Sequence, residues 1–267
     1  MNKTRYGFAF MLGAIAIGMN HTATAADTVE PITATADIDW SKLQLTATGV
    51  DESVPTVQYR DQHTSVSSNA WSNTSSETNF RSVNNWTDTA QTNADAGTAY
   101  ASAIASTLDF SGAAVSGESG NANSSGNRSV NFSLDGPGVL TVTVPYTLTL
   151  TGDTSGCYYC YGDRASVSAN ASFHSYGDNG SSDSYSNTSF SLYNDYWHAS
   201  PDSQSGTLVF GIFASGAGTG SLTFNFDLAA GGGSVNPIPE PESYAMLLAG
   251  LGLIGMMMRR RKISRIA

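Results

Sequence analysis

Residues 140–151 alternate strictly between apolar and hydroxylated side chains. The even positions hold Leu, Val or Tyr, and the odd positions hold Thr, apart from Pro145. Successive side chains of a β-strand point to opposite faces, so this pattern predicts a strand with an apolar face inward and a threonine face toward solvent. Because Pro145 has no backbone N–H, we expect an edge strand, a bulge or a break between two strands at that position.

The same period of two recurs along the chain and predicts further strands. The clearest cases are residues 130–134, 165–173 and 222–228, and Asp-Gly-Pro-Gly at 135–138 predicts a turn. A denser apolar run predicts a strand buried on both faces, at residues 208–213. Three further segments are weaker strand candidates: 43–47, 54–59 and 104–110.

Helical periodicity is almost absent from the chain. Its best helix candidate is the Ala-rich segment 90–105, which has poor capping residues and is interrupted by Gly97. Short alternating strands separated by Gly, Asn, Ser and Asp are typical of β-sandwiches. For residues 27–228 we therefore expect a single all-β domain, an antiparallel β-sandwich or a jelly-roll-like fold.

The charge of the chain is unevenly distributed. Of 12 basic and 22 acidic residues in the 267-residue sequence, residues 27–238 keep 5 basic and 20 acidic, a net charge of −15. This excess of acid argues against a nucleic-acid partner, whose phosphates attract Lys and Arg. The chain also has too many aromatic residues for a disordered acidic protein, and its 2 Cys are too few for a disulfide-framework scaffold.

The first 25 residues are typical of a secretory signal peptide. Lys3 and Arg5 give a positive start, residues 6–19 are apolar, and residues 23–25 supply the small Ala-Thr-Ala site that signal peptidase accepts. A buried helix or a membrane anchor is the alternative, but the apolar run is short for a bilayer span of about 20 residues. We expect cleavage after Ala25 or Ala26 and export of the rest of the chain.

The C-terminal end has a different order of parts. Residues 229–236 form a Gly-rich linker by composition, and a segment with three prolines follows at 237–242. After it come an apolar run, 244–258, and a basic cluster, 259–262. As a helix the apolar run is roughly 22 Å long, so it spans a ~30 Å hydrocarbon core only with local thinning and snorkelling of the arginines. The basic cluster stays cytoplasmic, which places the body across the membrane.

This order of parts resembles the PEP-CTERM sorting signal of Gram-negative bacterial proteins. The resemblance covers about 30 residues and rests on the Leu-Leu-Ala-Gly-Leu-Gly-Leu core at 247–253 and on six residues around it: Pro239, Glu240, Pro241, Arg259, Arg260 and Arg261. It departs from the family pattern only in the short extension 263–267. The simpler alternative is a plain C-terminal membrane anchor.

The resemblance implies a processing step. Proteins with this tail are similar to substrates of an exosortase, a membrane-embedded cysteine transpeptidase or protease that acts near the Pro-Glu-Pro. The prolines and Glu240 are then recognition residues for another enzyme. The resemblance also implies an inner-membrane-anchored precursor and a mature form at the cell surface or outside the cell, in bacteria that build exopolysaccharide and biofilm.

Cys157 and Cys160 form a C-x-x-C motif in an exported chain, between predicted strands. A small structural disulfide is the favoured interpretation, and a zinc half-site with His174 or a free dithiol is the alternative.

Residues 178–183, Asp-Asn-Gly-Ser-Ser-Asp, offer a weak calcium candidate through Asp178 and Asp183, without the spacing of an EF-hand. We expect no other metal and no cofactor.

Aromatic residues are concentrated between 158 and 197. They pack in the core or contribute to β-propensity, but four of them, flanked by Asn and Asp, are also candidates for binding sugar rings: Tyr158, Tyr159, Tyr196 and Trp197. No Gly-x-Ser-x-Gly nucleophile motif is present, and six aspartates offer carboxylate pairs for a glycosidase-like reaction: Asp153, Asp163, Asp178, Asp183, Asp195 and Asp202.

These observations predict a non-catalytic structural or adhesive protein, linked to exopolysaccharide or biofilm. The alternative is a carbohydrate-binding, lectin-like module, and a secreted hydrolase is a third function to test. The expected partners are signal peptidase and an exosortase during processing, the membrane before processing, and exopolysaccharide.

Overall fold

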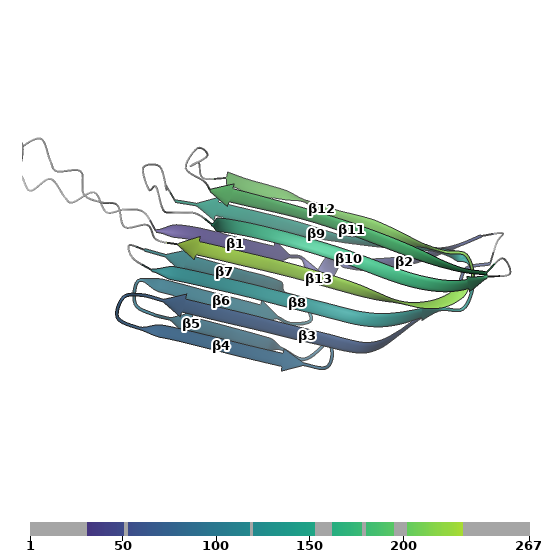
Figure 1. Cartoon of the computed structure of the whole chain (residues 1–267), viewed down its shortest axis with the longest axis horizontal. Coiled ribbons are helices and arrows are strands. Elements are labelled where there is room, and N and C mark those ends of the chain that lie inside the picture. Colours follow the sequence, from purple (N-terminus) through teal and green to yellow (C-terminus); the bar gives the residue numbers. More distant parts are fainter. Residues whose placement is uncertain are drawn as a thin grey trace, which may run out of the picture.

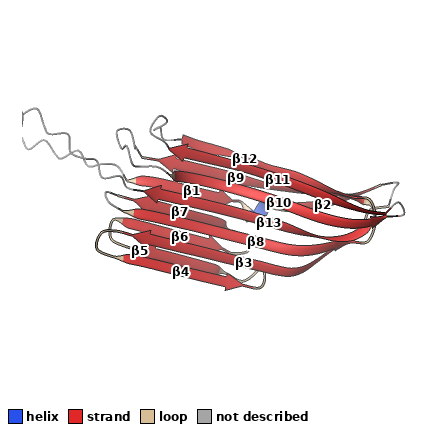
Figure 2. Cartoon of the chain, in the orientation of Figure 1, coloured by secondary structure: helices blue, strands red, loops and turns tan. Residues whose placement is uncertain are grey.

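The computed structural model describes residues 31–50, 53–117, 120–152, 162–177, 180–194 and 202–231. These residues form β-strands and one short 3-10 turn, η1 (Trp40–Lys42), as Figure 2 shows. The strands are β1 (Ile32–Ile38), β2 (Gln44–Gly49), β3 (Val57–Trp71), β4 (Ser76–Val83), β5 (Ala90–Asp95), β6 (Ala99–Ala105), β7 (Phe110–Ser116), β8 (Asn121–Leu134), β9 (Gly138–Thr151), β10 (Asp163–Gly177), β11 (Gly180–Asn194), β12 (Asp202–Ala214) and β13 (Ala217–Gly231).

Two antiparallel sheets lie face to face and enclose the core between them (Figure 1). The six-stranded sheet has the order β11-β10-β13-β8-β3-β4. The seven-stranded sheet has the order β12-β9-β1-β7-β6-β5, and β2 pairs with β9 beside β1. The described part of the chain is therefore all-β and antiparallel with a sandwich arrangement, as the alternating pattern predicted.

The clearest predicted strands are confirmed. β9 buries every even residue from Leu140 to Leu150, and β8, β10 and β13 bury the apolar positions that the sequence singled out. Pro145 does not end a strand, because β9 runs through it. The interruption lies in the segment that pairs with β9, where β1 ends at Ile38 and η1 precedes β2. There the Asp39 backbone N–H donates to the Pro145 carbonyl (3.0 Å). The N–H that Pro145 lacks would therefore point to the segment between β1 and β2, where no strand needs it.

The helix candidate at residues 90–105 is wrong. These residues form the β5–β6 hairpin, with Gly97 in the turn at φ 74°. Alanine stands at every second position of β6 and faces the core, so its abundance reflects a thin, closely packed sandwich and not helix propensity.

Two apolar segments also differ from expectation. Residues 208–213 lie in β12 with one buried face, while Val209 and Phe213 are exposed. The weaker candidate at 104–110 spans a turn between β6 and β7, and that at 54–59 reaches β3 only from Val57. The candidate at 43–47 matches most of β2.

An aromatic cluster fills the centre of the sandwich. The Trp40 ring from η1 lies edge-on to Trp86, Phe110 and Phe224, with ring centroids 5.0 to 5.7 Å apart. The guanidinium of the fully buried Arg128 lies 4.3 Å from the centroid of Trp40 and donates to the Ser106 carbonyl (2.6 Å). Cation–π contacts and this hydrogen bond offset part of the cost of burying the charge.

Both ends of the described chain lie at the same end of the sandwich, which we call the tail end. β1 begins there beside Gly152, and β13 ends there at Gly231, whose N–H donates to Asp163 (2.6 Å). Ala230 is buried in β13, so the first residues of the predicted linker 229–236 belong to the last strand. Residues 1–30 and 232–267, with the predicted signal peptide and apolar helix, lie outside the described residues. Among the described residues, no helix is long and apolar enough to cross a membrane.

Candidate binding face

The outer face of the six-stranded sheet is a layer of uncharged polar side chains. In β10, β13, β8 and β3 one set of alternate residues packs into the core, and the other points to solvent with hydroxyl or amide groups. We call this layer the polar floor. Its members are Ser65, Ser67, Ser125, Asn127, Ser129, Asn131, Ser166, Ser168, Asn170, Ser172, Ser221, Thr223 and Asn225.

Hydrogen bonds between neighbouring strands orient part of the polar floor. The Asn127 amide donates to the Asn225 side-chain oxygen (2.7 Å), and the Asn225 amide donates to the Ser168 hydroxyl (3.4 Å). The hydroxyls of Ser172 and Ser221 are 2.9 Å apart. Each amide and hydroxyl has more donor and acceptor positions than these bonds use. The floor therefore offers many oriented groups to a hydroxyl-rich ligand.

Aromatic side chains stand on the two edge strands that border the polar floor. On β11, Tyr185 and Tyr193 are 77% and 62% exposed, and on β4, Phe80 is 68% exposed. Register places Tyr185 beside Ser172 and Phe80 beside Ser67. We call the side chains of Phe80, Tyr185 and Tyr193 the aromatic rim. Exposed rings beside polar groups provide an apolar contact surface within a hydrophilic face.

Two shallow hollows lie on the polar floor. The tail-side hollow, about 270 Å³, is lined by Ser67, Phe80, Asn127, Asn225 and Asp227, among others. The far hollow, about 360 Å³, is lined by residues of β3, β8, β10 and β13, among them Arg60, Asp61, Asn131, Ser133, Ser172, Thr219 and Ser221. A concave surface with convergent polar groups is the usual form of a ligand site.

A β-bulge in β3 shapes the border of the far hollow. The register with β8 shifts between Arg60 and His63, and Asp61 adopts a positive φ of 52°. The Asn131 amide donates to the Asp61 carboxylate at 3.4 Å. A third hollow, about 710 Å³, lies at the bulge. Its lining residues are Tyr59, Arg60, Asp61, Gln62, His63 and Asn84. Bulges re-aim side chains at functional edges of sheets.

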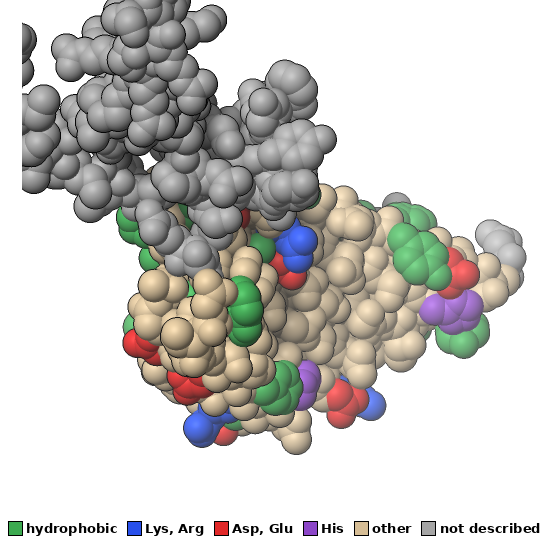
Figure 3. Space-filling model, turned by 60° about the vertical axis from the view of Figure 1, so that its left-hand side comes forward, with side chains coloured by type: hydrophobic (Ala, Val, Ile, Leu, Met, Phe, Trp, Pro, Cys, Tyr) green, Lys and Arg blue, Asp and Glu red, His purple; other side chains and the backbone are tan. Residues whose placement is uncertain are grey.

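The charges on this face largely cancel. Arg164 and Asp227 form an ion pair (2.7 Å), and the far hollow contains one arginine and one aspartate. Figure 3, which looks onto this side of the molecule, shows a wide surface of uncharged polar side chains with a few charged groups around it.

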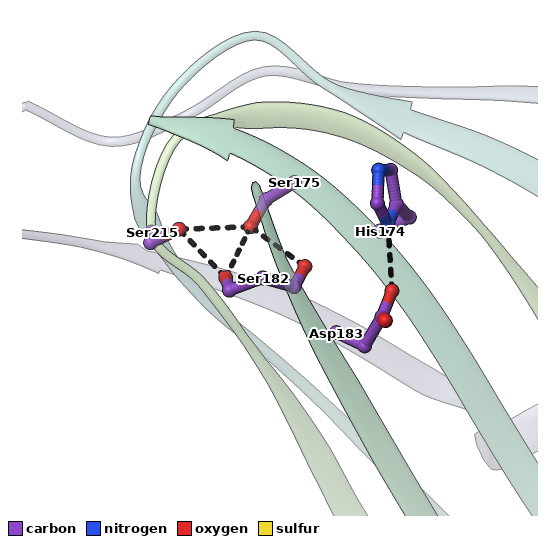
Figure 4. A network of polar contacts seen from close by, with 5 residues as sticks. All are labelled: His174, Ser175, Ser182, Asp183 and Ser215. Carbon is purple, nitrogen blue, oxygen red and sulfur yellow. Dashed lines mark hydrogen bonds and ion pairs between the residues drawn. The ribbon is translucent and has the colours of Figure 1, made fainter. Parts of the chain in front are cut away.

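His174 and Asp183 form a hydrogen-bonded pair at the end of the sheet opposite the tail end. The His174 Nδ1 lies 2.6 Å from the Asp183 carboxylate, and the Tyr176 ring lies edge-on to the imidazole. Three serine hydroxyls form a closed triangle nearby, Ser175, Ser182 and Ser215, 2.8 to 2.9 Å apart (Figure 4). Because Ser175 is buried on the inner side of the sheet and His174 points outward, no serine of this triangle hydrogen-bonds the imidazole.

Of the site residues that the sequence predicts, four lie in the described part of the chain: Asp163, His174, Asp183 and Asp202. Asp183 pairs with His174, and the described residues contain no group of three or more His, Cys, Asp or Glu that could hold a metal ion. The calcium partner Asp178, the Cys157–Cys160 pair, the carbohydrate candidates Tyr158, Tyr159, Tyr196 and Trp197, and the sorting residues lie outside the described residues. The strands that flank residues 153–161 and 195–201 end and begin at the tail end.

Asp163 is the one predicted carboxylate that the described structure places in the core, with 2% of its surface exposed. It accepts the Gly231 N–H through Oδ1, and Oδ2 has no partner. Burial raises the pKa of Asp163 to about 6, although the Gly231 hydrogen bond acts in the opposite direction. Asp163 and Asp183 lie near opposite ends of the β10–β11 hairpin, roughly 36 Å apart along the strands, so they cannot act as a catalytic pair.

Comparison with known families identifies the C-terminal segment. The family model described as the PEP-CTERM protein-sorting motif matches residues 237–262. The chain ends in a PEP-CTERM motif. The motif implies an exported protein whose membrane-anchored precursor is processed by an exosortase. No curated protein and no solved structure matches the chain.

The polar floor was not predicted from the sequence of this PEP-CTERM protein. Strands β4 and β11 are rich in Ser, Asn and Thr, and the inward positions of β3 and β11 include Thr64, Ser68 and Ser186. The apolar alternation that marks a strand is therefore weak there. A signal is present in β8, where Asn and Ser fill nearly every odd position from 121 to 133.

Proposed function

We propose that this protein is a non-catalytic adhesive component of the cell surface or extracellular matrix, and that it holds exopolysaccharide on the outer face of its six-stranded sheet. The observation that carries the proposal is the polar floor bordered by the aromatic rim. The PEP-CTERM motif supports it, because that motif implies that the protein is exported.

The chemistry of the face suits a sugar polymer. Hydroxyl and amide groups both donate and accept hydrogen bonds, as do sugar hydroxyls, and exposed aromatic rings pack against the apolar C–H face of a sugar ring. Because the polar floor extends over four strands, it can contact several sugar units of one chain at once.

Two arrangements in the described residues favour binding over hydrolysis. The His174–Asp183 pair lacks a hydrogen-bonded serine, and Asp163 and Asp183 lie too far apart to share one glycosidic bond. A non-catalytic role accounts for both without further assumptions.

The test is co-sedimentation of the purified protein with the insoluble exopolysaccharide of the organism that produces it. Thr223→Trp places a bulky ring in the polar floor, and Thr149→Trp places the same ring at an equivalent outward position of β9 in the other sheet. We expect binding by the unaltered protein and by Thr149→Trp, and weak binding by Thr223→Trp.

Absence of binding by the unaltered protein would contradict the proposal. Shortening of the polysaccharide during the incubation would show instead that the protein is a hydrolase, so chain length is measured by size-exclusion chromatography before and after.

A further inference from the structure

We propose that the ligand is an uncharged polysaccharide and that one chain lies along β8 and β13, occupying the tail-side and far hollows together. This inference rests on the proposed function and adds to it the class of polysaccharide, the direction of the chain and the residues that hold it.

The two hollows lie along the same pair of strands. Asn127 on β8 and Asn225 on β13 line the tail-side hollow, and Asn131 and Ser221 of the same strands line the far hollow. Asn131 is four positions after Asn127, which is about 14 Å along the strand. Thr223 and Ser129 lie between them with small, outward side chains. An extended polymer can therefore run over both hollows without crossing a ridge of large side chains.

Each hollow has an aromatic side chain beside it. Phe80 forms part of the wall of the tail-side hollow. Tyr185 is the cross-strand neighbour of Ser172, which lines the far hollow. The two rings stand on opposite edge strands, so they flank the path of the polymer from both sides.

The electrostatics favour an uncharged polymer. Asp227 in the tail-side hollow is neutralised by Arg164, and Arg60 and Asp61 balance each other in the far hollow. Residues 27–238 as a whole carry a net charge of −15, which repels an acidic polysaccharide over the range of the Debye length. No cluster of basic side chains on the described part of this face offsets that repulsion.

The experiment measures binding of the full-length protein to the producer's own exopolysaccharide, separated on an anion-exchange resin into uncharged and acidic fractions. Part of the uncharged fraction is cleaved into short fragments. The variants are Phe80→Ala, Tyr185→Ala and the double variant. Phe213→Ala and Tyr100→Ala, exposed aromatic residues of the other sheet, are the matched controls.

We expect the protein to bind the uncharged fraction, with an affinity that changes little between low and high salt, and to bind short fragments more weakly than long chains. Each single variant lowers affinity for long chains by about three- to tenfold, the double variant lowers it by roughly the product, and the controls leave it unchanged.

Three outcomes separate the inference from the proposed function. Failure to bind either fraction overturns the proposed function itself. Equal or stronger binding of the acidic fraction, or normal binding by the double variant, overturns this inference and leaves the proposed function standing. If the protein binds polysaccharide but this inference is overturned, loss of binding in Trp197→Ala would assign the site to the aromatic segment predicted from the sequence.

Discussion

At the scale of single residues, the buried carboxyl of Asp163 links the stability of the fold to pH. The folded protein retains this proton up to about pH 6, whereas the ordinary pKa is 3.8. Because the pKa is raised, the protonated carboxyl contributes its full stabilisation of the fold below pH 3.8. This contribution is lost as the pH rises through about 6.

Asp163→Asn should therefore change the pH dependence of unfolding. The amide cannot ionise. Between pH 4 and pH 7 the free energy of unfolding of the variant should therefore rise by about 2 kcal/mol relative to that of the unaltered protein. Denaturant unfolding at both pH values measures this difference, with the exposed Asp202→Asn as the control. Parallel pH profiles for Asp163→Asn and the unaltered protein would show that burial of Asp163 does not affect folding.

Gly126 tests the close packing between the sheets. A Cβ at this position would collide with the ring of Phe226 and lie 2.7 Å from the ring of Phe110. Gly126→Ala should therefore lower the free energy of unfolding by about 1–3 kcal/mol, because both rings are fixed in the core. Gly136→Ala is the matched control, since no atom lies near its Cβ. Equal unfolding midpoints for the two variants would contradict this packing.

At the scale of elements, the bulge in β3 shapes the border of the far hollow. Asp61 occupies the left-handed region, where a β-branched residue is strained. We expect Asp61→Val to lower the free energy of unfolding by about 1–2 kcal/mol, whereas Asp61→Gly changes it little. Thermal or denaturant unfolding checks both variants. A valine variant as stable as the glycine variant would argue against the positive φ.

Element by element, the sequence predicts strands well where one face is apolar and the other is hydroxylated. β9 shows this from Leu140 to Leu150, and Pro145 was placed correctly on the outward face although its partner strand, not β9, is interrupted. β5 and β6 were misjudged because alanine favours helices in isolation yet fits a narrow space between sheets.

The polar floor was harder to predict because it depends on pairing between distant segments. Asn127 and Asn225 are neighbours through the β8–β13 register, and no local pattern in either strand indicates that pairing. The aromatic enrichment between residues 158 and 197 did include Tyr185 and Tyr193, which the structure places on the aromatic rim. It could not show which tyrosines face outward beside hydroxyl groups.

At the scale of the whole molecule, the tail end and the polar floor occupy different parts of the sandwich. The tail end holds both ends of the described chain, and the sorting motif follows β13 by only a few residues. The polar floor extends from there along β8 and β13 toward the opposite end, where His174 and Asp183 lie. Tethering at the tail end would therefore leave most of the polar floor accessible.

The central claim is that the PEP-CTERM tail is removed and that the folded body then acts outside the cytoplasm. Intact mass and C-terminal peptide mapping of the native protein, from envelope and medium fractions, test it most directly. We predict a chain that begins near Asp27 and ends near Pro239 to Glu242, without the basic cluster. A mature protein that still contains Arg259, Arg260 and Arg261 would show that the tail is only an anchor and would contradict exosortase processing.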